Sequence, residues 1–109
     1  MPPAAFEAFS EGRTLTWALD GVDYGIERYA PGRRVIWADL TGTCLSGHWQ
    51  AQGDEVCFHY DDDPDGTPAC WRFLRDGKTV IADLTRTDEP LRLTVVSQEG
   101  ALVCPDFGS

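Results

Sequence analysis

Residues 15–26 read Leu-Thr-Trp-Ala-Leu-Asp-Gly-Val-Asp-Tyr-Gly-Ile, with large apolar side chains on both sides of an Asp-Gly pair. Asp-Gly is a favoured two-residue hairpin turn, because both positions tolerate positive φ. Such a turn places Leu19 opposite Val22, Trp17 opposite Tyr24 and Leu15 opposite Ile26. All three pairs are apolar and share one face, which predicts an antiparallel hairpin with one buried side.

Two further turns give equally coherent faces. A turn at Asp76-Gly77 pairs Phe73 with Val80, Trp71 with Ala82 and Ala69 with Leu84. A turn around Gly53-Asp54 places Gln50 opposite Glu55; its inner face then holds Leu45, Trp49, Val56, Phe58 and Tyr60, and its outer face holds Cys44, His48, Cys57 and His59. A wrong register would rarely separate apolar from polar residues at independent turns.

Turn signals of this kind recur along the whole chain, at a spacing typical of all-β domains. Strands are expected at about 13–19, 22–29, 34–40, 44–51, 54–60, 69–75, 78–84 and 91–96, with a ninth at 101–104. The fold class is therefore all-β, an antiparallel meander of eight or nine short strands. Closure into a small barrel is favoured over a partly open one because it removes exposed strand edges, and we expect side chains to fill the interior.

A chain of 109 residues is expected to form a single domain, 1–109. Its parts are an N-terminal segment (1–12), the β-meander (13–104) and a tail (105–109). A short helix is predicted at 4–10, because Phe6 and Phe9 have i, i+3 spacing. The net charge is −9, from 18 acidic and 9 basic residues, which argues against binding to nucleic acid. No apolar run approaches the length of a membrane span.

The cysteines Cys44, Cys57, Cys70 and Cys104 form no Cys-x-x-Cys pair, so a zinc or thioredoxin-like motif is poorly supported. We expect two disulfides, as in small exported domains with thin cores, and hence a periplasmic or secreted protein. The predicted register favours Cys57 with Cys70 as diagonal neighbours, His59 lying directly opposite Cys70, and Cys44 with Cys104. The other two connectivities stay open. The start at Met1-Pro2-Pro3 has no signal-peptide character, so we interpret the chain as a mature form with an added Met.

One loop has the opening pattern of a calcium-binding loop, with Asp61, Asp63 and Asp65 alternating before a glycine. Position twelve, where such loops carry a bidentate Glu, is Arg72, so any calcium site is expected to be weak. His48 and His59 share the predicted outer face and offer a second metal hypothesis, although two surface imidazoles are the commoner outcome. A solvated hairpin loop and no cofactor are the favoured interpretations.

Aromatic side chains are numerous for a chain of this length. Trp17, Trp37, Trp49, Trp71, Tyr24 and Tyr60 are candidates for lining the mouth of the barrel, where they could hold a small apolar ligand. Packing in the core is the alternative, since large rings fill a small core efficiently. No nucleophile motif is present and no residue is predicted to be catalytic, so we do not expect an enzyme.

The elements Cys44-Leu45-Ser46-Gly47-His48-Trp49, Cys57-Phe58-His59-Tyr60 and Cys70-Trp71-Arg72-Phe73 resemble a group of small exported proteins of alphaproteobacteria. The resemblance covers most of the chain after about residue 12. It implies export and a disulfide-linked β fold, and it transfers no functional residue. The leading hypothesis is a secreted or periplasmic binding or interaction module that recognises a protein or envelope component without catalysis. A small-ligand carrier and a weak calcium-binding module are the alternatives.

Overall fold

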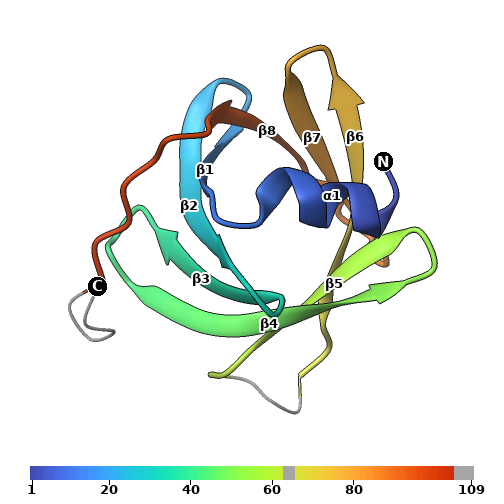
Figure 1. Cartoon of the computed structure of the whole chain (residues 1–109), viewed down its shortest axis with the longest axis horizontal. Helices are drawn as coiled ribbons and strands as arrows, with labels where there is room; N and C mark the ends of the chain where they lie inside the picture. The colour runs from blue at the N-terminus through green and yellow to red at the C-terminus, as the bar shows by residue number, and fades with distance from the viewer. Residues whose placement is uncertain (63–65, 105–109) are drawn as a thin grey trace.

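A computed structural model describes residues 1–62 and 66–104. One helix, α1 (Pro3–Ser10), precedes eight strands in the described residues. The strands are β1 (Thr14–Leu19), β2 (Val22–Ala30), β3 (Arg34–Asp39), β4 (Cys44–Gln52), β5 (Glu55–Tyr60), β6 (Ala69–Asp76), β7 (Thr79–Leu84) and β8 (Arg92–Ser97). Each strand pairs antiparallel with the next, and β8 pairs with β1 to close the barrel (Figure 1). The predicted all-β meander, its closure and the short helix are confirmed; the ninth strand at 101–104 does not form.

The first hairpin has the predicted turn but a different register. Asp20 and Gly21 both have positive φ, 51° and 82°, as the expected turn requires. A β-bulge then follows, so Trp17 lies opposite Gly25 and Leu15 lies opposite Glu27. The predicted pairs of Trp17 with Tyr24 and Leu15 with Ile26 are therefore wrong. The bulge adds one residue to β2 and moves the next residues to the opposite face.

The other two hairpins keep their predicted faces but slip by two residues. Gln52 rather than Gln50 is opposite Glu55, because the turn is a tight pair at Gly53-Asp54. In the β6–β7 hairpin, Phe73 is opposite Ala82 rather than Val80, because the turn residues are Gly77-Lys78, with positive φ at Gly77. A slip of two residues preserves every side chain's face, since the period of a strand is two.

Both favoured disulfides form. Cys57 lies directly opposite Cys70, rather than diagonal to it, and bonds to it across β5 and β6. Cys44 bonds to Cys104 and holds the C-terminal segment against the outside of the barrel, where Leu102 packs beside Ala38. Within the described residues no cysteine is free.

One end of the barrel is closed by α1, which lies across the interior (Figure 1). Phe6 is fully buried and stacks on Phe73 with ring centroids 3.8 Å apart. The same ring meets Tyr29 and Trp49 edge-on. The interior is thus filled at the α1 end, as expected, but not along its full length. No described helix has the length and apolar character needed to cross a membrane.

Candidate functional site

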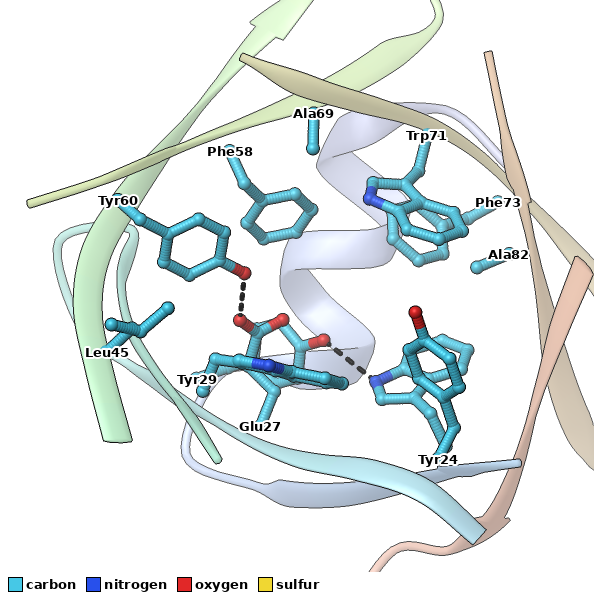
Figure 2. Close-up of a pocket in the computed structure, with 12 residues that line it drawn as sticks. Tyr24, Glu27, Tyr29, Leu45, Phe58, Tyr60, Ala69, Trp71, Phe73 and Ala82 are labelled. Carbon is cyan, nitrogen blue, oxygen red and sulfur yellow. Dashed lines mark hydrogen bonds between the residues drawn. The ribbon is translucent and has the colours of Figure 1, made fainter. Parts of the chain in front are cut away.

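The opposite end of the barrel contains a cavity of about 230 Å³. Eight of its twelve lining residues are aromatic. The wall comprises Trp17, Tyr24, Glu27, Tyr29, Trp37, Leu45, Phe58, Tyr60, Ala69, Trp71, Phe73 and Ala82 (Figure 2). Tyr29 and Phe73 also touch Phe6 of α1, so the helix supports the floor of the cavity.

Two glycines inside strands make room for rings in the wall. A Cβ atom at Gly25 would overlap the indole of Trp37, and a Cβ atom at Gly47 would overlap the backbone of β5 and crowd Tyr60. Glycine in a strand interior often marks such a close approach. These positions therefore set where Trp37 and Tyr60 lie at the rim.

Glu27 places a carboxyl group inside this aromatic wall. The residue is only 4% exposed, and its carboxylate accepts a hydrogen bond of 2.5 Å from the hydroxyl of Tyr60. None of the ion pairs among the described residues includes it. Burial raises the pKa of Glu27 from 4.5 to about 7, and hydrogen bonds to the Tyr60 and Tyr29 side chains oppose that rise. Perturbed carboxyls of this kind concentrate at functional sites.

The tyrosine hydroxyls beside Glu27 stay protonated. Burial raises the pKa of Tyr29 and that of Tyr60 well above 10, and the charge of Glu27 adds to both shifts. The indole Nε1 of Trp17 donates a hydrogen bond of 3.1 Å to the Tyr29 hydroxyl. Figure 2 shows both hydrogen bonds beside the cavity. The cavity therefore offers apolar ring faces and one small polar cluster.

Most of the aromatic candidates lie where the sequence predicted. Trp17, Trp37, Trp71, Tyr24 and Tyr60 line the cavity. Trp49 does not: it packs at the α1 end, against Phe6 and under the guanidinium of Arg33, 4.4 Å from the ring centroid. Its side chain points into the barrel from β4, as predicted, but α1 fills the interior beside it.

The remaining wall residues were missed as site residues. The inner face predicted from alternation already contained Leu45, Phe58, Ala69, Phe73 and Ala82. Glu27 and Tyr29 are absent from the predicted inner face because regular alternation does not show the bulge in β2. The signal for that bulge is Gly25, a glycine within a strand pattern directly after Tyr24.

The two metal hypotheses concern the acidic loop and the histidine pair, and the structure describes only part of that loop. The Asp61 carboxylate accepts a 2.6 Å hydrogen bond from Ser46, and the other proposed calcium ligands, Asp63 and Asp65, lie outside the described residues. His48 and His59 are paired across β4 and β5, and their rings stack at 5.2 Å. Across 1–62 and 66–104, no three His, Cys, Asp or Glu side chains are grouped to hold a metal ion. Calcium binding by the loop stays a prediction.

Comparisons with known protein families, curated proteins and solved structures find no match to this chain. The candidate site is the cavity, which has three main features. They are the aromatic wall, the buried carboxyl group of Glu27 and the opening opposite α1.

Proposed function

We propose that this protein is a non-catalytic binding protein that takes a compact, largely apolar ligand into the open end of its barrel. The observation that supports this most strongly is the cavity of about 230 Å³ with an aromatic wall. Apolar pockets with a few convergent polar groups are the usual form of small-ligand sites.

Binding of a ligand inside the barrel is favoured over docking of a protein on its outside. The large aromatic side chains face the interior, whereas the exposed large apolar residues are mostly aliphatic: Val22, Leu40, Leu74, Val96 and Val103, with Tyr24 at the rim. Single exposed apolar residues are normal on a soluble surface. The interior is thus the better candidate for recognition.

The size of the cavity limits the ligand. An apolar cavity of roughly 150 Å³ accommodates benzene, so about 230 Å³ suits a single ring with a short substituent. Pockets for drug-sized molecules are larger, at about 300 Å³ or more. A compact ligand of about nine non-hydrogen atoms fits this comparison.

General acid–base catalysis is a second candidate, favoured by the pKa of about 7 at Glu27. Of the residues that line the cavity, none is a Ser, Thr, Cys, His or Lys, so Glu27 has only tyrosine hydroxyls as chemical partners. Binding is preferred for that reason. Mass spectrometry of each bound probe after prolonged incubation separates the two, because turnover changes the probe and binding leaves it intact.

Filling the cavity is expected to abolish binding. Ala69→Phe puts a ring into the space that Ala69 borders. Single-ring probes, beginning with benzyl alcohol, should raise the melting temperature of the wild-type protein and shift its tryptophan emission, because a ligand of the native state stabilises it. Both effects should disappear in the variant, whose own unfolding should stay cooperative.

Ala51→Phe is the matched control, since Ala51 is exposed and does not border the cavity. This variant should bind each probe as the wild-type protein does. Equal binding by Ala69→Phe and wild type would place the ligand elsewhere. If no single-ring probe affects melting or emission of the wild-type protein, the proposed function is wrong.

We also propose that the protein works in an oxidising compartment, the periplasm or the cell exterior. The support is the pair of disulfides, Cys44–Cys104 and Cys57–Cys70, because such bonds persist where thiols are oxidised. Protein isolated from its natural source without reductant and then unfolded should show no reactive thiol. After reduction it should show four. Four thiols before reduction would contradict export.

A further inference from the structure

We propose that the ligand is a compact organic ammonium ion, held with its positive charge at Glu27 and its apolar body against the aromatic wall. The proposal rests on the proposed function and names the ligand class for the same cavity. It follows from the carboxyl group, the ring faces and the charge around the opening.

The first argument concerns Glu27. Burying a carboxylate without a cation beside it costs free energy. The hydroxyls of Tyr60 and Tyr29 hydrogen-bond to its carboxyl group, but both are neutral, and none of the ion pairs among the described residues supplies a positive charge. A buried carboxylate is normally paired with a cation or held by several donors. An ammonium ion in the cavity would supply both a charge and N–H donors.

The wall is the second argument. Rings from five strands surround the cavity, including Trp17 of β1, Trp37 of β3 and Trp71 of β6. The face of an aromatic ring attracts a cation within about 6 Å of its centroid, and tryptophan does so most strongly. Aromatic walls that recognise alkylammonium groups use this attraction. A neutral ligand packs against the same rings but lacks this attraction between charge and ring face.

The charge around the opening is the third argument. The hairpin connections and strand ends there carry acidic residues, Asp20, Asp23, Asp39, Asp61 and Asp62. In the described parts of these connections and strand ends, the Arg or Lys residues are Arg86 and Arg92. Their guanidinium groups already pair with acidic side chains, Arg86 with Glu55 and Arg92 with Asp83. A negative rim attracts cations and repels anions at low salt. The rim and the interior therefore favour the same sign of ligand.

Three probes with the same ring test the proposal: benzylamine, benzyl alcohol and benzoate, which at pH 8 are cationic, neutral and anionic. Affinity for the wild-type protein, measured by calorimetry and tryptophan emission, should be about tenfold or more tighter for benzylamine than for benzyl alcohol. Benzoate should bind weakest. Equal binding of benzylamine and benzyl alcohol would overturn the ammonium proposal and leave the proposed function standing.

Glu27→Gln keeps the shape and the acceptor for Tyr60 but removes the charge. This variant should lose the preference for benzylamine and keep its affinity for benzyl alcohol. Glu11→Gln loses the same charge at an exposed position after α1 and should behave as wild type. If Glu27→Gln retains the full preference, Glu27 does not recognise the charge. If none of the probes binds the wild-type protein, the proposed function and the ammonium proposal both fail.

A pH series provides a separate readout. The titratable groups that face Glu27 are Tyr29 and Tyr60, which stay protonated across neutral pH. Benzylamine should therefore bind more tightly as the pH rises from 5 to 8 and Glu27 loses its proton, whereas benzyl alcohol should show no such rise. A flat profile for benzylamine would contradict the pairing with Glu27.

Discussion

Phe6→Ala is expected to lower the free energy of unfolding by about 3–5 kcal/mol, the range for removing a fully buried phenylalanine. Phe6 has no exposed surface, and its ring lies between α1 and the barrel wall. It stacks on Phe73 and meets Tyr29 edge-on, so its removal leaves a void that the closed barrel cannot collapse to fill. Chemical denaturation monitored by tryptophan emission measures the change.

Glu7→Ala on the same helix is the control. Its carboxylate pairs with Arg33 at 3.3 Å, but both side chains are partly exposed, at 31% and 42%. Exposed pairs contribute about 0–1 kcal/mol, so this variant should unfold almost as the wild-type protein does. If Phe6→Ala costs less than about 1 kcal/mol, α1 is not part of the cooperative core.

Phe6→Ala should also affect the cavity, because Tyr29 and Phe73 belong both to the contacts of Phe6 and to the cavity wall. We expect weaker binding of single-ring probes even under conditions where the variant is fully folded. Unchanged binding would mean that the wall keeps its shape without the helix beneath it.

The architecture was predictable because alternation and turn chemistry act locally. Face assignments for β4–β7 survived a two-residue register error, since a strand repeats every two residues. The predicted disulfide between Cys57 and Cys70 is also correct, because a shift of two residues leaves both cysteines on the same face. Strand positions therefore followed from local pattern even where the partners were wrong.

The site was less predictable because it depends on one β-bulge and on the position of α1. This helix precedes the meander in the sequence but packs inside the barrel. A bulge in β2 exchanges the faces of Ile26 and Glu27, and regular alternation cannot show it. Whether Trp49 lines a cavity or a core depends on where α1 lies inside the barrel. No periodicity within β4 contains that information.

Glu27 is expected to make stability fall as the pH rises from about 4.5 to about 7, the interval between its ordinary and its folded-state pKa. In this interval the folded protein keeps the proton on Glu27 while the unfolded chain releases it. The folded state then binds more protons, so the free energy of unfolding decreases with increasing pH. At pH 8 this shift lowers the free energy of unfolding by about 3 kcal/mol, since each pKa unit is worth about 1.4 kcal/mol.

Other carboxyl groups act in the opposite direction and in a lower interval. The pKa of Asp83 is lowered chiefly by its hydrogen bonds from Arg92, and that of Glu55 chiefly by Thr85. Stability from these groups is present at neutral pH and is lost as the pH falls through their folded-state pKa. The contribution of Glu27 is therefore isolated by subtracting the pH profile of Glu27→Gln from that of the wild-type protein.

Glu27→Gln cannot ionise and keeps an oxygen acceptor for the Tyr60 hydroxyl, so it avoids the cost of a buried charge. The variant and the wild-type protein should have similar stability near pH 4.5, and the variant should be about 3 kcal/mol more stable at pH 8. Urea denaturation at each pH measures both. Parallel profiles would mean that the carboxylate of Glu27 is solvated in the folded protein. An ammonium ligand should narrow the difference at pH 8, because it stabilises the ionised wild-type site and has no charge to meet in the variant.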